Sequence, residues 1–193
     1  MMIQIIDYGA GNLASVANAL TKLGQEYEII SSPIELRDDS KIIFPGVGAA
    51  GSAMAMLRAT GFDAVLPTIT RPFLGICLGM QLLMPYSEEN DTACLDIVDG
   101  EARKFTCDLK VPQIGWNTAT KLCDDPLFAG IPDDSYFYFV NSYCVETPYA
   151  ISQTDYGYHF ASALKKDNFY GVQFHPEKSG EVGLRLLLNF CEL

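Results

Sequence analysis

In the first half of the chain, short apolar runs alternate with segments in which apolar residues recur at every third or fourth position. An unbroken apolar run of about four residues is typical of a buried strand, and the longer spacing is typical of an amphipathic helix. The predicted strands cover residues 3–6, 27–30, 41–44 and 72–76, and the predicted helices cover residues 13–23 and 49–59. Strands that alternate with helices predict a parallel sheet covered by helices.

The second half of the chain follows a different pattern. β-Branched and aromatic residues dominate residues 101–117 and 136–143, and residues 159–164 and 169–174 have the pattern of a β-hairpin that extends the sheet. A last helix is predicted over residues 180–190. We therefore expect an α/β fold: a three-layer sandwich with a mostly parallel central sheet, flanking helices and an antiparallel hairpin extension in the C-terminal half.

Length and composition indicate one domain that covers residues 1–193. The 49% of hydrophobic residues is enough for a core, and no repeat or linker divides the chain. No apolar run approaches the ~20 residues that cross a bilayer, so we expect neither a signal peptide nor a membrane anchor. A formal charge of −11 repels nucleic acids and anionic lipids, and neither is expected as a partner. The acids between Glu88 and Glu101 are interpreted as a solvated edge.

The cysteines are scattered along the chain. They occupy positions 77, 94, 107, 123, 144 and 191, without a Cys-x-x-Cys pair, and only two histidines accompany them. This spacing predicts neither a disulfide framework nor a zinc site, and we expect no metal. Free thiols suit a reducing compartment, so we expect a cytoplasmic protein.

One cysteine lies in a motif with chemical meaning, Gly75-Ile76-Cys77-Leu78-Gly79. A predicted strand precedes Cys77 and a predicted helix from Leu78 to Met84 follows it, so Cys77 falls on a strand-to-helix turn that exposes a nucleophile. The flanking glycines leave room for a strained backbone and for a substrate. The helix N-terminus favours a thiolate. A buried structural cysteine is the alternative interpretation.

A nucleophilic thiol needs a base, and His175 is the favoured candidate. It follows a predicted strand, and Glu177 stands two residues further on, so both side chains are expected on one side of an extended chain, with the carboxylate orienting the imidazole. Pro176 between them indicates a strand end or edge. His159, the rival base, has no acid two positions away and is expected to be structural.

Donors for an oxyanion are expected at the same edge of the sheet. The N–H of Leu78, directly after Cys77, is the expected first donor. A second is expected from Pro45-Gly46-Val47-Gly48, which ends a predicted strand. Its glycines allow a peptide N–H to turn toward the site or away from it, so the oxyanion hole is expected to be conditional. A tight strand-to-helix turn explains the same glycines equally well.

The segment Gly9-Ala10-Gly11-Asn12-Leu13-Ala14 satisfies a weak form of the dinucleotide-binding fingerprint. That motif requires an acidic residue at the end of the second strand, where Ser31 and Ser32 stand instead. We therefore expect a surface turn in which Asn12 is the helix N-cap.

Together these residues resemble the class I (triad) glutamine amidotransferases, and within them the glutaminase subunits of imidazole glycerol phosphate synthase. The blocks that carry the resemblance are Ile6-Asp7-Tyr8-Gly9-Ala10-Gly11-Asn12-Leu13, Pro45-Gly46-Val47-Gly48, Gly75-Ile76-Cys77-Leu78-Gly79-Met80-Gln81, Val111-Pro112 with Gly115-Trp116-Asn117, and Gly171-Val172-Gln173-Phe174-His175-Pro176-Glu177-Lys178-Ser179. They cover nearly the whole chain. The first block, Gly115-Trp116-Asn117 and Lys178-Ser179 distinguish the subunit from the wider family.

The resemblance implies the amidotransferase fold and an enzyme that hydrolyses L-glutamine to glutamate and ammonia through a cysteinyl thioester, without a cofactor. By the same resemblance, the catalytic triad is Cys77, His175 and Glu177. The implied oxyanion donors are the N–H groups of Val47 and Leu78. The implied substrate-binding residues are Gly46, Gly48, Gln81, Ser142 and Tyr143.

The resemblance also implies a partner, the cyclase subunit of the synthase. That subunit is a (β/α)₈ barrel, forms a heterodimer with the glutaminase and uses the ammonia in histidine biosynthesis. Asn12, Trp116 and Lys178 are the implied interface residues. In this family the glutaminase is weak until the partner is docked and liganded, which gives the Val47 peptide a switching role.

Gln113 and Asn141 stand where many members of the family carry histidine. Neither belongs to the triad, but both bear on glutamine contact and partner coupling. Two alternatives stay open: a glutaminase subunit of another synthase (for anthranilate, aminodeoxychorismate or surface-sugar amidination), and a non-catalytic regulatory partner of the same fold. Gly115-Trp116-Asn117 and Lys178 argue against the first alternative, and the intact triad argues against the second.

Overall fold

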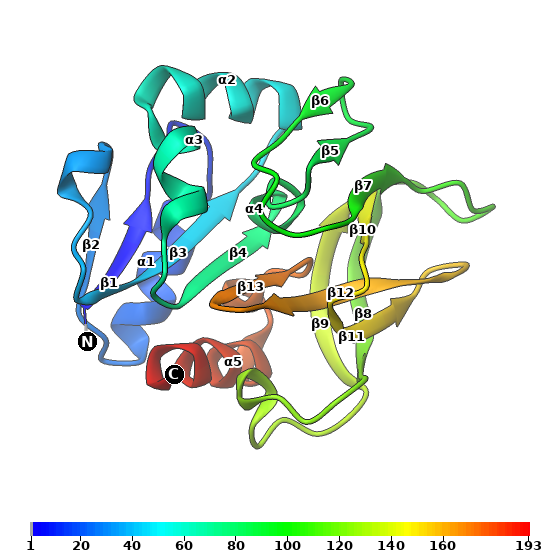
Figure 1. Cartoon of the computed structure of the whole chain (residues 1–193). Helices are drawn as coiled ribbons and strands as arrows, with labels where there is room; N and C mark the ends of the chain where they lie inside the picture. Colours follow the sequence, from blue (N-terminus) through cyan, green and yellow to red (C-terminus); the bar gives the residue numbers. More distant parts are fainter. Residues whose placement is uncertain (1) are drawn as a thin grey trace.

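The computed structural model describes residues 2–193, and a large mixed sheet forms its centre (Figure 1). The neighbouring strands of its parallel half are β2 (Tyr27–Ile30), β1 (Met2–Ile6), β3 (Ser40–Gly46), β4 (Phe73–Cys77) and β13 (Phe169–Val172). Strands β3 and β4 are buried along their whole length. A parallel strand covered on both faces has no polar side, which explains the unbroken apolar runs.

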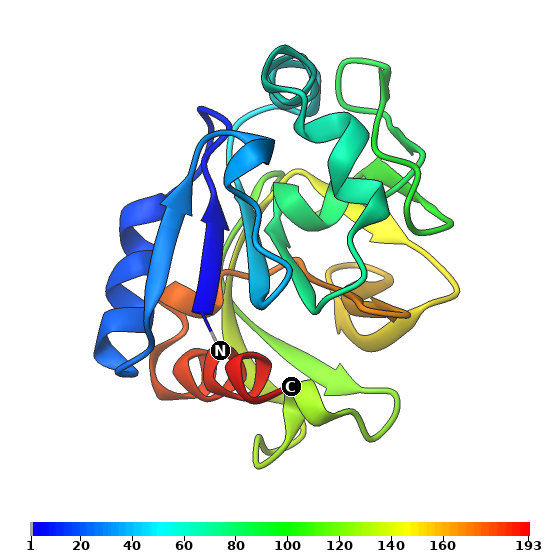
Figure 2. The same ribbon diagram turned by 60° about the vertical axis from the view of Figure 1, so that its left-hand side comes forward.

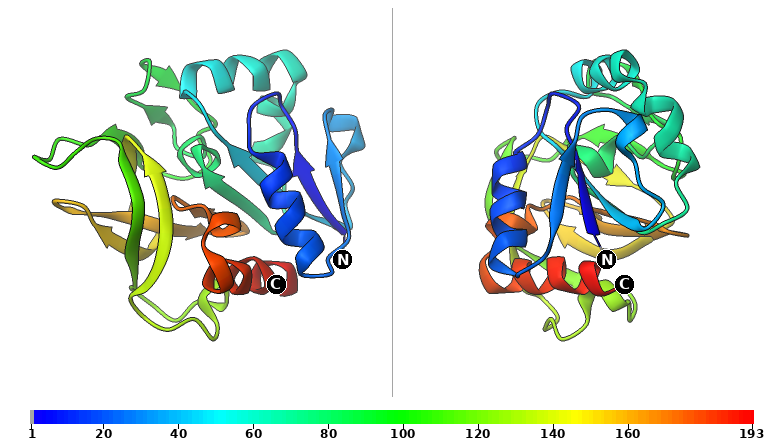
Figure 3. Two further views of the ribbon diagram at one scale, coloured as in Figure 1. Left: turned by 180° about the vertical axis from the view of Figure 1, so that it is seen from behind. Right: turned by 90° about the vertical axis from the view of Figure 1, so that its left-hand side faces the viewer.

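Helices cover both faces of this parallel half, so the three-layer α/β prediction is confirmed (Figure 2, Figure 3). Helices α1 (Leu13–Lys22) and α5 (Gly180–Glu192) share one apolar cluster with alternate strand residues such as Ile5. The intervening strand residues, such as Ile6, belong to a second apolar cluster. That cluster includes residues of α2 (Ala50–Thr60) and α3 (Phe62–Val65).

The antiparallel half begins with the predicted hairpin, in which β12 (His159–Lys166) pairs with β13 across the turn at Asp167 and Asn168. Beyond β12 the sheet continues, strand by strand, with β10 (Tyr143–Glu146), β7 (Glu101–Lys104), β5 (Tyr86–Ser87) and β6 (Thr92–Ala93). Strands β11 (Ala150–Asp155), β8 (Gln113–Lys121) and β9 (Ser135–Asn141) branch from β12. They form a layer beside the parallel half (Figure 1).

The remaining elements are short. Helix α4 (Leu78–Gln81) ends before the predicted limit at residue 84, and the chain then turns into β5. The 3-10 helices are η1 (Pro33–Glu35), η2 (Leu66–Thr68), η3 (Pro126–Phe128) and η4 (Pro176–Lys178). Each carries proline at its first or second position, where the fixed φ of proline suits a helical start. Within residues 2–193, no helix has the length and apolarity needed to cross a membrane.

Candidate active site

Cys77 is the last residue of β4 and directly precedes α4, so it lies on the strand-to-helix turn that the motif predicts. Its backbone has φ 56° and ψ −111°. This conformation costs a non-glycine residue roughly 1–3 kcal/mol, and such strain is concentrated at functional sites. The side chain is 7% exposed and lines a cavity at the carboxyl edge of the parallel strands.

The glycines around Cys77 serve the packing of α4 rather than the approach of a substrate. A Cβ atom at Gly75 would lie 2.6 Å from the carbonyl oxygen of Gly79, and a Cβ atom at Gly79 would overlap the carbonyl oxygen of Phe44. Helix α4 therefore lies directly on the backbone of β3 and β4. The strain of the turn is carried by Cys77 itself, because neither glycine has a positive φ.

His175 and Glu177 are joined by a hydrogen bond, with 2.8 Å between Nδ1 of the ring and Oε1 of the carboxylate. Both side chains are almost fully buried. The expected extended geometry is wrong, because β13 ends at Val172 and Glu177 lies in the 3-10 helix η4. Glu177 reaches the ring from this turn instead, since Pro176 starts a helix rather than ending a strand.

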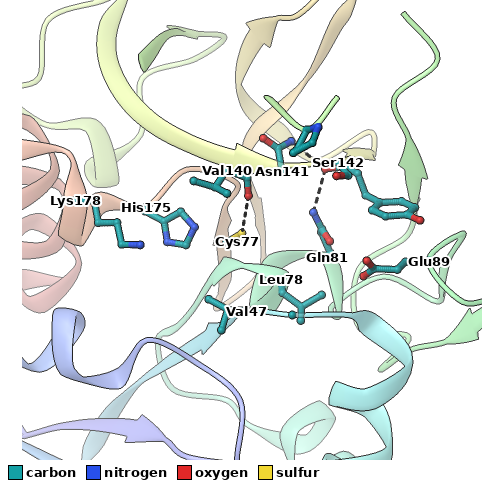
Figure 4. A pocket seen from close by; sticks show the side chains of 13 residues that line it. Val47, Cys77, Leu78, Gln81, Glu89, Val140, Asn141, Ser142, His175 and Lys178 are labelled. Carbon is teal, nitrogen blue, oxygen red and sulfur yellow. Dashed lines mark hydrogen bonds between the residues drawn. The ribbon is translucent and has the colours of Figure 1, made fainter. Parts of the chain in front are cut away.

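The ring of His175 faces the sulfur of Cys77 (Figure 4). Burial alone lowers the pKa of His175, but the hydrogen bond with Cys77 and the Glu177 carboxylate outweigh burial and raise this pKa to about 10. The imidazole consequently holds its proton at neutral pH. An imidazolium beside a sulfur stabilises the thiolate, which is the nucleophilic form of cysteine.

The Gly46–Gly48 segment lies beside the turn that carries Cys77, because β3 and β4 pair in parallel with Gly46 opposite Cys77. Val47, Gly48 and Leu78 line the cavity, whereas Gly46 packs beneath it. A Cβ atom at Gly46 would lie 2.7 Å from the backbone nitrogen of Gly79 and 2.9 Å from the Tyr8 hydroxyl oxygen. Gly48 has φ 92°, a conformation that favours glycine.

The cavity has a volume of about 320 Å³, at the small end of ligand sites. It brings together most of the residues predicted from the sequence. Those that line it are Val47, Gly48, Cys77, Leu78, Gln81, Ser142, Tyr143, His175 and Lys178. Gly46, Glu177 and Asn12 lie outside it, along an adjacent crevice, and Trp116 is on the surface with 56% exposure.

Glu89 also lines the cavity, and sequence reasoning missed it. Its Oε2 accepts a hydrogen bond from the backbone N–H of Ala50 at 2.7 Å, which fixes the carboxylate at the start of α2. The acids between Glu88 and Glu101 were expected to form a solvated edge, and Glu89, which is half-exposed, also lines this cavity. The sequence carries no signal that separates a carboxylate in a cavity from one in water.

The amide of Gln81 is held by the protein. Its Nε2 donates to the carbonyl oxygen of Tyr143 at 3.0 Å and to Oε1 of Gln173 at 2.9 Å, so its own oxygen remains free to accept. Asn141, one of the two departures from the family pattern, lines the same wall and donates to the Tyr143 carbonyl at 2.9 Å. Gln113 is its partner across β8 and β9. Two amides thus replace the usual histidines as a buried cross-strand pair.

Two other expectations concern residues away from Cys77. His159 starts β12, is exposed, and lines a separate hollow with Leu122 and Glu146. Asn12 occupies the N-cap position of α1, but its side chain makes no capping hydrogen bond. Across residues 2–193, no group of three or more histidine, cysteine or acidic side chains is arranged to hold a metal ion.

Comparison with known proteins agrees with this geometry. The family model described as glutamine amidotransferase class-I matches residues 4–192. Imidazole glycerol phosphate synthase subunit HisH of Bacteroides thetaiotaomicron is 44% identical to the chain, and the subunit of the same name from Bacteroides fragilis strain YCH46 is 46% identical, each over the full length of both chains. A solved glutamine amidotransferase structure has the same fold, with 15% identity and a TM-score of 0.76 over 98% of this chain and 97% of the other. The chain therefore belongs to the class-I glutamine amidotransferase family, among the HisH subunits of imidazole glycerol phosphate synthase.

Proposed function

We propose that this chain hydrolyses L-glutamine to L-glutamate and ammonia, with Cys77 as nucleophile, His175 as acid and base, and Glu177 as the group that orients the imidazole. The observation that carries the proposal is the buried Cys77–His175–Glu177 arrangement at one wall of a cavity of amino-acid size. In the established families of this chemistry, a nucleophile, a base and an orienting acid in contact act as one unit.

In the first half of the reaction, the Cys77 thiolate attacks the side-chain amide carbon of glutamine. A carbon–sulfur bond forms and the carbonyl oxygen becomes an oxyanion, to which the N–H groups of Leu78 and Val47 donate. The carbon–nitrogen bond then breaks while the His175 imidazolium gives its proton to the departing nitrogen, which leaves as ammonia. The raised pKa of His175 supports this order, because the ring must carry a proton before ammonia leaves.

In the second half, the neutral His175 takes a proton from a water molecule that attacks the thioester. The same two N–H groups stabilise the second oxyanion, and its collapse breaks the carbon–sulfur bond. Glutamate is released, and the thiolate and imidazolium are restored. Glu177 keeps its bond to Nδ1 throughout, which leaves Nε2 directed at the reacting atoms.

The far end of the cavity supplies groups for the amino-acid end of glutamine. The carboxylate of Glu89 and the free oxygen of Gln81 are acceptors suited to an α-ammonium group. We assign the α-carboxylate of the substrate to Ser142 and to the backbone of Tyr143, which adjoins Gln81. We assign the carbonyl of the substrate's side chain to the backbone of Gly48. A few polar groups at defined positions in a cavity fix the orientation of a bound zwitterion.

We further propose that the ammonia passes to the cyclase subunit of imidazole glycerol phosphate synthase, a (β/α)₈ barrel, in a heterodimer. One face of the β8–β9 ribbon supports this partner surface. Ile114, Trp116 and Tyr136 are each more than half exposed there, and the same face reaches the cavity at Val140. Exposed aromatic and apolar groups of this kind mark protein interfaces. Lys178 at the cavity mouth and Asn12 in the adjacent crevice extend the proposed surface.

The whole chain, residues 1–193, is proposed to act as one glutamine amidotransferase domain. We place it in the cytoplasm, where its six cysteines, all free in the structure, suit a reducing environment.

Covalent labelling with a glutamine-mimicking diazo-ketone tests the proposal. We expect wild type to be labelled at Cys77, Cys77→Ala to remain unlabelled, and Cys123→Ala, which removes an exposed cysteine far from the cavity in sequence, to react like wild type. L-Glutamine should protect wild type from the label. Equal labelling of wild type and Cys77→Ala, located by mass spectrometry, would remove Cys77 from the mechanism.

A further inference from the structure

Gln173 contacts the nucleophile from a position that the steps above do not use. It lies between β13 and His175, its side chain is fully buried, and its Nε2 is 3.7 Å from the sulfur of Cys77. An amide N–H directed at a sulfur stabilises the sulfur most when the sulfur is negatively charged.

The orientation of the Gln173 amide follows from its neighbours. The backbone carbonyl of Tyr143 can only accept, so Gln81 must direct its NH₂ group toward it. The second hydrogen of that NH₂ group is donated to Oε1 of Gln173. Gln173 therefore presents its oxygen to Gln81 and its own NH₂ group to Cys77. A backbone atom thus fixes the direction of the whole chain of hydrogen bonds.

The other groups around the sulfur define what Gln173 adds. The carbonyl oxygen of Val140, also 3.7 Å from the sulfur, accepts only from the thiol form. Tyr8 stays protonated, because burial and the charge of Cys77 raise its pKa. His175, supported by Glu177, faces the sulfur but gives up its proton during each turnover in the mechanism proposed above. Glu89 and Lys178 are the remaining charged groups on the cavity wall.

We propose that Gln173 is a positioning residue that holds the Cys77 sulfur in place and favours its thiolate form, in an orientation imposed by Gln81. The role rests on the function proposed above. It supplies a donor that no step of the cycle removes, because an amide does not lose its proton at any working pH. It also links the amino-acid end of the cavity to the nucleophile, since Gln81 contacts both Gln173 and the proposed substrate.

The pH dependence of Cys77 alkylation by iodoacetamide tests this role, followed on the peptide that carries Cys77. In Gln173→Met, which keeps the length of the side chain but removes the donor, we expect the pH of half-maximal alkylation to rise by about one unit. In Gln81→Met we expect a smaller rise, because Gln173 loses the contact that orients it. Iodoacetamide needs no amino-acid site, so weakened glutamine binding does not affect the result.

Asn189→Leu is the matched control. Asn189 is also a buried amide, but it donates to the backbone carbonyls of Leu127 and Ala129, away from the cavity. In Asn189→Leu, the pH dependence of Cys77 alkylation should equal that of wild type even if the thermal stability of the variant falls. In the complex with the cyclase, Gln173→Met should lose roughly tenfold in kcat with little change in KM.

A wild-type alkylation profile in Gln173→Met would overturn the proposal, whether or not its kcat falls, because a fall in kcat alone would indicate only packing. Failure of the proposed function would look different. If wild type released no glutamate with the cyclase, the function would be wrong, while the alkylation profile would still decide the role of Gln173.

Discussion

At the scale of single residues, local motifs identify the reacting groups, whereas folding identifies the groups that support them. Cys77 stands between two glycines, and His175 is followed by an acid two residues later, so both are visible in the sequence. Gln173 is not, because its contact with Cys77 joins positions 96 residues apart. Glu89 is hidden for another reason: a surface acid and a cavity acid have the same local sequence.

The protonation of His175 is the first prediction at this scale. Its folded pKa of about 10 lies above the ordinary value of ~6.5, so it gives stability that is fully present below pH ~6.5 and is lost as the pH rises through 10. Glu177→Gln removes the carboxylate charge and should lower this pKa by about one unit or more. An NMR titration of the histidine ring resonances measures the pKa of His175 in wild type and in Glu177→Gln.

Because the chain has only two histidines, assignment of that titration is simple, and His159, which lines a different hollow, is the internal comparison. Cys77→Ala should lower the pKa of His175 as well, since it removes the first of the contacts that raise it. Titration of His175 near pH 6.5 in wild type would contradict the imidazolium–thiolate pair.

At the scale of elements, the spacing of apolar residues predicts the long strands and helices. Short elements contain too few residues to show such a spacing. The predicted strand at residues 27–30 matches β2, and the predicted helix at 13–23 matches α1 within one residue. Helix α4 is held against the backbone of β3 and β4 by contacts at Gly75 and Gly79, and no apolar pattern encodes contacts of this kind. The 3-10 helix η4 was missed because proline is compatible with both a strand end and a helix start.

Gly79→Ala tests the packing of α4. The added Cβ would overlap a backbone oxygen of β3, which cannot move aside as a side chain can, so we expect a loss of about 2 kcal/mol or more in the free energy of unfolding. Gly51→Ala is the control, because Gly51 is also helical and its Cβ would meet only side chains, those of Asn90 at 3.2 Å and Thr92 at 3.4 Å.

Chemical denaturation measures both variants. Gly51→Ala should stay within about 1 kcal/mol of wild type, since alanine favours a helix more than glycine does. Equal stability of Gly79→Ala and wild type would contradict the view that these glycines exist for close packing.

At the scale of the whole molecule, the site and the proposed partner surface are parts of one structure. The β8–β9 ribbon carries exposed aromatic residues on the face that leads to Val140 in the cavity wall. The sequence indicated Trp116 only through a family resemblance. Its exposure and its place on this ribbon come from strand register, which cannot be derived from apolar spacing alone.

Trp116→Ala should weaken binding of the cyclase subunit by about 2 kcal/mol, roughly 30-fold in Kd, because exposed tryptophans are frequent interface hot spots. Ile34→Ala is the control, since Ile34 is 91% exposed but lies in η1, outside the ribbon. Isothermal titration calorimetry measures both affinities. Equal affinities for Trp116→Ala and wild type would remove this ribbon from the proposed interface.

Glutamate release is the most direct test of the central claim, that this chain is a cysteine-dependent glutaminase controlled by its partner. It should be measured for the chain alone and with the cyclase subunit and its nucleotide, in wild type and in Cys77→Ala. We predict slow release alone, stimulation of roughly tenfold or more in the complex, and a loss on the order of 100-fold or more in Cys77→Ala. A rate unchanged by the partner, or unchanged by the loss of Cys77, would contradict the account.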